Sequence, residues 1–386
     1  MTARRVLTLN AGSSSLKFAL FEAELAASPR LLLRGQLSGS TPRVVVNDGQ
    51  GQPVLDQPWP RSDEPDAVLL LELVEGLAEG EPLNAVGHRI VHGGQRFTAP
   101  EIVTARTLEG MESLIPLAPL HQPLGLAAVH ALLQARPNLR QVCCFDTAFH
   151  RDLAGPVARY ALPRQLEAQG IRRYGFHGLS YQYIAQHLKQ HWPETYGGRV
   201  IVAHLGSGAS LCAMRNGHSL DTTMGFSTLD GLVMATRPGS IDPGVLLYLL
   251  HSGMNVDQLE HLLYHECGLL GVSGRSGDVR SLLAGTDPAS IEALELFVFS
   301  IARHVAALAN TLGGLDALIF TGGVGEHCAP IRLAVAQKLA WLGVELSLES
   351  NDSGRRKISS SASLILCLVV PTDEEQVMAE QVLSLL

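Results

Sequence analysis

Arginine, histidine and aspartate recur beside glycine along the chain, and such side chains can handle charged substrates. Arg89 lies in GHRIVHGG, His177 in RRYGFHG and Arg237 in TRPGSIDPG, while Asp146 ends the apolar run CCFD. Two like charges about 4 Å apart repel by about 1 kcal/mol in water and by several times that in a dry site. An anion that attacks a phosphoryl group needs cations to offset this repulsion. The set therefore indicates phosphoryl transfer, with surface salt bridges for the arginines and a helix N-cap for Asp146 as alternatives.

Small-residue turns form a second set of candidates. LNAGSSSLKF at 9–18 gathers Asn10, Ser13, Ser15 and Lys17 around one turn, whose backbone N–H groups and hydroxyls could face a phosphate. A plain hairpin turn explains this motif equally well. HLGSGAS at 204–210, TGGVGEH at 321–327 and the polar loop SGRSGDVR at 273–280 are similar, and together they favour a nucleotide cleft. The chain contains neither a Walker Gly-Lys-Ser/Thr loop nor a G-x-G-x-x-G fingerprint, which disfavours two common nucleotide folds.

A group of acids follows an apolar segment near the end of the chain. SLILCLVV at 363–370 is expected to be a buried strand, and Asp373, Glu374 and Glu375 come directly after it. A carboxylate in this position could bind Mg²⁺. Capping of the helix that follows explains the same acids, so the motif alone decides nothing.

Elements that could position these residues alternate along the chain. Residues 6–10 and 16–21 are expected to be strands around a polar turn, and this unit recurs at 199–214. Residues 122–135 and 288–312 have helical periodicity, and Asp287, Pro288 and Gly313 mark the ends of the second helix. This pattern predicts an α/β protein with two related domains and a cleft between them.

Composition limits the class of protein. The chain has 386 residues, of which 46% are hydrophobic and 17% charged, as in globular proteins. Its net charge of -8 and the lack of a Lys/Arg run make nucleic acid an unexpected partner. Its 6 cysteines contain no C-x-x-C pair. No segment has the roughly 18 apolar residues that a membrane span requires, so we expect no membrane partner and a cytoplasmic location.

In order along nearly the whole chain, the motifs resemble those of the acetate kinase family, with propionate kinase as a close relative. The family belongs to the superfamily of sugar kinases, heat-shock ATPases and actin, whose duplicated domains close over ATP. The resemblance implies an N-terminal domain of residues 1–147, a nucleotide-binding domain of 148–372, and a C-terminal helix at 373–386 that packs on the first. The motifs that carry it are LNAGSSSLKF, GHRIVHGG, PLAPLHQP, CFDTAFH, RRYGFHG, AHLGSGAS, DTTMGF, TRPGSIDPG, FTGGVGE and VVPTDEE.

The resemblance implies reversible transfer of a phosphoryl group from ATP to acetate, with Mg²⁺ or Mn²⁺ as cofactor, in a homodimer. The site residues that it implies are Asn10 and Glu374 at the metal; Lys17 at the ATP phosphates; Arg89 at the substrate carboxylate; Val91, Leu120 and Phe176 around the acyl group; Asp146, His177 and Arg237 in catalysis; and His204, Leu205, Gly206, Ser207, Gly208, Asp278, Val279, Arg280, Gly323, Val324, Gly325, Glu326 and His327 at the nucleotide. Because a carboxylate substrate is already ionised, we expect Asp146 to orient Arg or hydrated Mg²⁺ and not to abstract a proton.

The chain departs from the family pattern at several of these motifs. Ser207 and His327 each replace a usual asparagine, Arg237 is followed by Pro-Gly-Ser and not Ser-Gly-Asp, and Thr228 replaces a pocket proline. Thr228 leaves open a kinase of the same fold for propionate or another short-chain carboxylate. A second alternative is a non-catalytic, actin-like ATP-dependent switch. Such a switch does not need Arg89, His177 and Arg237 beside Asp146, so their joint presence argues against it.

Overall fold

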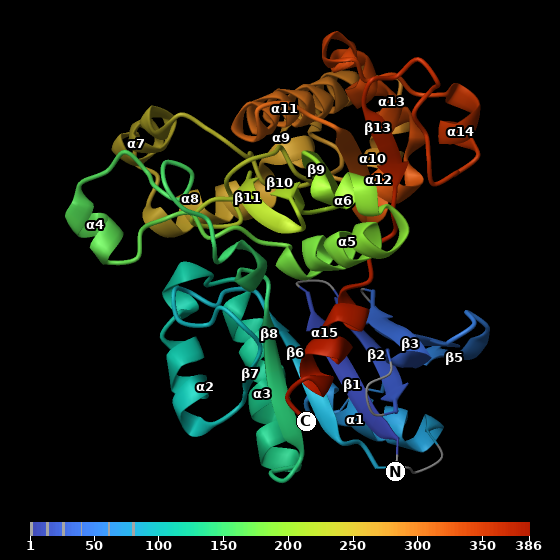
Figure 1. Ribbon diagram of the computed structural model, residues 1–386. Helices are drawn as coiled ribbons and strands as arrows, with labels where there is room; N and C mark the ends of the chain where they lie inside the picture. The colour runs from blue at the N-terminus through green and yellow to red at the C-terminus, as the bar shows by residue number, and fades with distance from the viewer. Residues whose placement is uncertain (1–2, 13–14, 25–27, 40, 61, 79–81) are drawn as a thin grey trace. The chain divides into compact units, whose positions relative to one another are not determined.

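The computed structural model describes residues 3–12, 15–24, 28–39, 41–60, 62–78 and 82–386, and it comprises two compact units. Unit 1 contains Met1–Arg151 and Asp373–Leu386, and unit 2 contains Asp152–Thr372. Each unit has a mixed β-sheet with helices packed against it (Figure 1). The α/β class expected from the sequence is confirmed.

The sheet of unit 1 has 8 strands in the order β5-β4-β3-β2-β1-β6-β8-β7. Strands β1 to β5 pair antiparallel, while β6 and β8 run parallel to β1. Neighbouring antiparallel strands can be joined by short turns, whereas parallel strands need a longer crossover connection. The strands are β1 (Arg4–Ala11), β2 (Ser15–Ala23), β3 (Arg30–Ser38), β4 (Arg43–Asp48), β5 (Pro53–Pro58), β6 (Ala85–Ile90), β7 (Glu101–Ile102) and β8 (Arg140–Phe145).

Helices cover both faces of this sheet because successive strand residues point to opposite sides. On one face, α1 and α3 pack over a core that includes Leu7, Leu9 and Phe18. On the other face, α15 packs over Ala19 and Phe21. The helices of unit 1 are α1 (Asp66–Leu77), α2 (Ala105–Glu112), η1 (Ile115–Leu117), α3 (Gln122–Ala135), η2 (Ala148–His150) and α15 (Glu374–Leu383).

The sheet of unit 2 repeats the strand order of unit 1. Its order is β11-β10-β9-β12-β13, with β9, β10 and β11 antiparallel and β12 and β13 parallel to β9. This is the arrangement of β3-β2-β1-β6-β8 in unit 1, so the predicted duplication is confirmed. The strands are β9 (Val200–Leu205), β10 (Ala209–Arg215), β11 (His218–Thr222), β12 (Ala317–Thr321) and β13 (Leu366–Val369).

The longest helix of unit 2, α11, has the ends that its sequence predicts. The side chain of Asp287 accepts a hydrogen bond from Ser290 N, and Gly313 ends the helix with a φ of 70°. The helices of unit 2 are α4 (Arg164–Ala168), α5 (Gly178–His191), α6 (Pro193–Gly197), α7 (Pro243–His251), α8 (Val256–His261), η3 (Leu262–Glu266, a π-helix), α9 (Gly268–Ser273), α10 (Val279–Leu283), α11 (Pro288–Leu312), α12 (Gly322–His327), α13 (Ala329–Lys338), η4 (Ala340–Leu342) and α14 (Leu348–Asp352).

Two further findings concern the cysteines and the length of the apolar helices. All six cysteines are free thiols. Across the described ranges, no helix is both long and apolar enough to cross a bilayer.

Candidate active site

In unit 1, Arg89 and Asp146 form an ion pair at the carboxyl ends of two neighbouring parallel strands. Arg89 lies near the end of β6 and Asp146 directly after β8. Arg89 Nη2 is 2.6 Å from Asp146 Oδ2, and Arg89 Nε is 3.1 Å from both carboxylate oxygens. Burial opposes the charge of Arg89, but attraction by Asp146 and Glu374 outweighs it and raises the pKa of the arginine. Thr147, and not Asp146, is the N-cap of η2.

Asn10 connects this pair to the acids of α15. Its Oδ1 accepts a hydrogen bond from Arg89 Nη1 at 3.0 Å, and its Nδ2 donates to Glu374 at 3.0 Å and to Glu375 at 3.3 Å. The unit 1 polar cluster therefore consists of Asn10, Arg89, Asp146, Glu374 and Glu375. Oxygen ligands of this type suit Mg²⁺, which binds through one or two carboxylates together with substrate phosphates. No group of three or more His, Cys, Asp or Glu side chains that could hold a metal ion occurs among the described residues.

The three acids after β13 have different surroundings. The side chain of Asp373 caps α15 by accepting from Gln376 N at 2.9 Å, and it lies 2.5 Å from Arg34 Nη2. Capping thus accounts for Asp373, while Glu374 and Glu375 both reach Asn10. Burial raises the pKa of Glu375, and the charges of Glu374 and Asp373 raise it further. The resemblance implies only Glu374 at the metal, whereas Glu374 and Glu375 both lie within hydrogen-bond distance of Asn10.

Further residues predicted for the site also belong to unit 1. Lys17 is exposed on β2, directly across from Asn10 on β1. Val91 is buried immediately after β6, and Leu120 is half-buried in the turn before α3. Ser13 lies outside the described residues.

In unit 2, Arg237 and His177 converge over Gly208. A Cβ atom on Gly208 would lie 2.6 Å from Arg237 Nη2 and 3.5 Å from His177 Nε2, so only glycine leaves this arrangement undisturbed. Arg237 Nη1 donates to Thr228 O at 2.8 Å, and no carboxylate pairs with Arg237 in the described part of the chain. Burial lowers the pKa of Arg237 to about 10. At neutral pH the site thus contains a half-buried positive charge that pairs with no carboxylate of the described residues.

The loop that carries Arg237 is held by hydrogen bonds on both sides. Ala235 N donates to Ser207 O at 3.1 Å, next to Gly208. From the other side, Cys267 N donates to Thr236 O at 3.0 Å, and Thr236 Oγ1 donates to Tyr264 O in the π-helix η3 at 2.7 Å. These bonds restrict the backbone of Arg237, which favours a single position of its guanidinium group.

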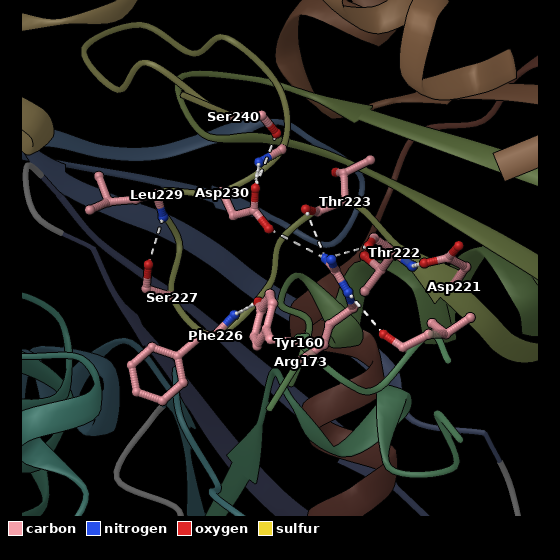
Figure 2. A network of polar contacts seen from close by, with 12 residues as sticks. Tyr160, Arg173, Asp221, Thr222, Thr223, Phe226, Ser227, Leu229, Asp230 and Ser240 are labelled. Atoms are coloured by element: carbon pink, nitrogen blue, oxygen red, sulfur yellow. Dashed lines mark hydrogen bonds and ion pairs between the residues drawn. The ribbon is translucent and has the colours of Figure 1, made fainter. Parts of the chain in front are cut away.

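A second polar network, shown in Figure 2, holds the segment that precedes Arg237. Arg173 Nη1 donates to the carbonyls of Thr222 and Thr223 at 3.0 and 3.2 Å, and it lies 3.5 Å from Asp230. The hydroxyl of Ser240 donates to Asp230 Oδ1 at 3.1 Å. An acidic side chain at position 240 would lie beside the carboxylate of Asp230, and the two negative charges would repel each other. The serine avoids this repulsion.

A cavity of about 300 Å³ lies where the sequence predicts the nucleotide. The glycine-rich turn after β9, helix α12 after β12 and the start of α10 form its wall. Cys328, which was not among the predicted site residues, also lines it. The predicted residues that line the cavity are Gly206, Ser207, Asp278, Val279, Arg280, Gly323, Val324 and His327.

The remaining predicted nucleotide residues do not line this cavity. Leu205 and Gly325 are buried, and His204 stacks on His177 with ring centroids 4.3 Å apart. Glu326 Oε1 accepts from Gly322 N at 2.9 Å and from Thr372 N at 3.1 Å, so its side chain binds backbone. No simple sequence signal separates these structural contacts from ligand contacts.

Comparison with known proteins identifies the family. Residues 5–380 match the model of the acetokinase family. The chain belongs to the acetokinase family. An acetate kinase of Rhodopseudomonas palustris is 47% identical to this acetokinase over 98% of this chain and 97% of the relative. Among solved structures, a propionate kinase of Francisella tularensis is similar with a TM-score of 0.89 and 35% identity, covering 98% of each chain. An acetate kinase of Porphyromonas gingivalis is similar with a TM-score of 0.85 and 34% identity, covering 99% of each.

Proposed function

We propose that this acetokinase transfers the terminal phosphoryl group of ATP to acetate, giving ADP and acetyl phosphate, and that the reaction is reversible. The observation that carries the proposal is the convergence of Arg237 Nη2 and His177 Nε2 over Gly208. Gly206 and Ser207 of the same turn line the predicted nucleotide cavity. Phosphoryl transfer depends mainly on positioning and on neutralising negative charge, and a half-buried arginine that pairs with no carboxylate of the described residues meets that need.

The substrate carboxylate would bind to Arg89. The side chains of Asp146 and Asn10 occupy its N–H groups from two directions and fix the plane of its guanidinium group. This supports the expectation that Asp146 orients an arginine and removes no proton. By resemblance to the family, Val91, Leu120 and Phe176 would contact the methyl group, and Thr228 stands where the family has a pocket proline.

Asn10 and Glu374 would hold Mg²⁺. The ion, when bound, would neutralise negative charge on the phosphates of ATP. Lys17 would bind the same phosphates, since it lies opposite Asn10 in the β1–β2 hairpin. The base and ribose would occupy the cavity around Asp278, Val279, Arg280, Gly323, Val324 and His327.

Propionate is a second candidate substrate, supported by Thr228 and by the similarity to a solved propionate kinase. We also propose a homodimer. Its support in the structure is α7, an apolar helix in which no residue is buried and in which Leu247 and Tyr248 are 57% and 71% exposed. Such exposed apolar surface is typical of interfaces. Cytoplasmic location remains a prediction from the sequence.

Acyl phosphate formation tests the proposed function directly. The purified protein is incubated with ATP, Mg²⁺, hydroxylamine and either acetate or propionate, and hydroxamate is measured against a reaction without carboxylate. We expect hydroxamate with both acids and more with acetate. Reactions in which neither acid raises hydroxamate above the background would contradict the proposal.

A further inference from the structure

The two ring nitrogens of His177 have different neighbours. Nε2 faces the point over Gly208 that Arg237 Nη2 also reaches. Nδ1 is 2.8 Å from the hydroxyl of Ser210, and that hydroxyl is 2.5 Å from the phenol oxygen of Tyr181. Tyr181, Ser210 and His177 thus form a chain of polar groups that leads from the core to the candidate active site.

This chain of polar groups lies in an otherwise apolar environment. Ser210 belongs to β10, in which the first six residues are all buried, and both Ser210 and Tyr181 have no exposed surface. A buried hydroxyl without a partner costs about 1 to 3 kcal/mol. Alanine and phenylalanine would fill the same space without that cost, so the two hydroxyls are explained by their bonds to each other and to His177.

Hydrogen-bond chemistry sets the direction of the chain. Burial raises the pKa of Tyr181 well above its usual value, so its phenol is protonated at neutral pH. A phenol is a better donor and a poorer acceptor than an alcohol, because its lone pair is delocalised into the ring. The phenol of Tyr181 therefore donates to Ser210, and the hydroxyl of Ser210 donates to His177 Nδ1. A neutral imidazole whose Nδ1 accepts has its proton on Nε2.

We propose that Tyr181 and Ser210 are positioning residues that hold neutral His177 with its proton on Nε2, ready to donate to the transferred phosphoryl group. The kinetic consequence of this proposal rests on the proposed function, while the tautomer does not. Among the described residues, Arg237 and His204 are two titratable or charged groups that face the ring, in addition to Tyr181 at the far end of the chain of polar groups. The positive charge of Arg237 disfavours a second positive charge on His177, which also favours the neutral ring.

The backbone of His177 agrees with a fixed side chain. His177 has a φ of 56°, in the left-handed region that non-glycine residues rarely adopt. Strained residues of this kind cluster at functional sites, where the surrounding structure holds them. Here the bond to Ser210 and the stacking on His204 hold the ring.

The tautomer can be measured in the unmodified protein. Two-bond ¹⁵N–¹H correlations of ¹⁵N-histidine-labelled protein distinguish a protonated from an unprotonated ring nitrogen, and the signals of His177 are those lost in His177→Gln. At pH 8 we expect the proton of His177 on Nε2. A proton on Nδ1 would overturn the proposal. The measurement itself is made on the unmodified protein, and His177→Gln serves only to assign the signals.

Tyr181→Phe tests the kinetic role. Without the phenol, the hydroxyl oxygen of Ser210 can accept a hydrogen bond from a protonated Nδ1. In a fraction of the molecules the neutral ring then has its proton on Nδ1 and not on Nε2. We expect kcat at pH 8 to fall about 3- to 10-fold, with KM for ATP and for the carboxylate unchanged. A loss that appears as raised KM values with kcat unchanged would count against the role.

A matched control and a second variant complete the test. Tyr183→Phe makes the same change on the same helix outside this chain of polar groups, and kcat should stay at the level of the parent protein. Ser210→Ala removes the hydroxyl that lies 2.8 Å from Nδ1 and should shift the tautomer signals of His177. If the parent protein forms no acyl phosphate but His177 has its proton on Nε2, the proposed function fails and the tautomer stands. If the protein is active but the proton is on Nδ1, the proposed function stands and the positioning role of Tyr181 and Ser210 fails.

Discussion

Arg89 in unit 1 and Arg237 in unit 2 are both largely buried, yet their electrostatic surroundings are opposite. Arg89 pairs with the carboxylate of Asp146 and with Asn10, and its pKa is raised. Arg237 bonds to the carbonyl of Thr228, and burial lowers its pKa. The difference indicates two uses of arginine. The charge of Arg89 is balanced by Asp146, and its guanidinium group is held in one orientation. Arg237 pairs with no carboxylate of the described residues, so its charge can stabilise the negative charge that develops in the transition state.

The first prediction concerns stability, where the two arginines should differ most. Arg89→Met removes the guanidinium group that pairs with the buried carboxylate of Asp146, and breaking a buried pair in this way costs about 3 to 5 kcal/mol. Arg237→Met removes a half-buried charge that pairs with no carboxylate of the described residues, so the free energy of unfolding should stay the same or rise. Urea unfolding followed by circular dichroism measures both. Equal losses in the two variants would mean that Arg237 has an ionic partner after all.

The second prediction concerns turnover. Arg237→Ala and His177→Ala should each lower kcat about 10²- to 10³-fold, the usual cost of removing a transition-state donor. Arg237→Lys should recover little, because an ammonium group cannot replace a planar fork. Arg303→Ala, which removes an exposed arginine of the same unit, is the control. Turnover close to that of the parent enzyme in both alanine variants would refute these roles.

The third prediction separates the two acids that reach Asn10. If Glu374 binds Mg²⁺, Glu374→Ala should raise the Mg²⁺ concentration needed for half-maximal activity about 10-fold or more. Glu375→Ala should have a smaller effect, although Glu375 also lies within hydrogen-bond distance of Asn10. Mg²⁺ titrations of initial rate measure both variants. Identical metal dependence would place the metal site elsewhere.

The fourth and smallest effect concerns the choice of acid. One methylene is worth about 1 to 3 kcal/mol in an apolar pocket, so acetate should lead propionate by no more than about 200-fold in kcat/KM. Thr228→Pro should sharpen this preference, because it restricts the segment whose carbonyl binds Arg237. Val91→Ala should raise kcat/KM for propionate more than for acetate. An unchanged ratio of the two values in Val91→Ala would show that Val91 does not line the acyl pocket.

Local features of the sequence predicted local features of the fold. The bounds of α3 and α11 equal the predicted ranges, because caps, proline and glycine act within one turn of the helix ends. The β1–β2 hairpin and its repeat at β9–β10 were also predictable, since turn residues between apolar strands mark them.

Contacts between distant parts of the chain were not predictable from local patterns. The motifs identified Arg89 and Asp146 as candidates, but only the parallel pairing of β6 and β8 brings them into contact. Ser210 appeared in the sequence only as the last residue of HLGSGAS, and Tyr181 was in none of the motifs, because a buried hydroxyl has no periodicity of its own. Their connection to His177 depends on how α5 lies against the sheet of unit 2.

The repeated hairpin also records how the two halves diverged. In the first copy, Asn10 near the end of β1 pairs across the turn with Lys17, and in the second copy His204 near the end of β9 pairs with Ser210. Matching positions thus hold a candidate metal ligand and a cation in one half, and a stacked histidine and a buried hydroxyl in the other. The two copies therefore share a strand order and differ in the side chains that the end of the hairpin presents.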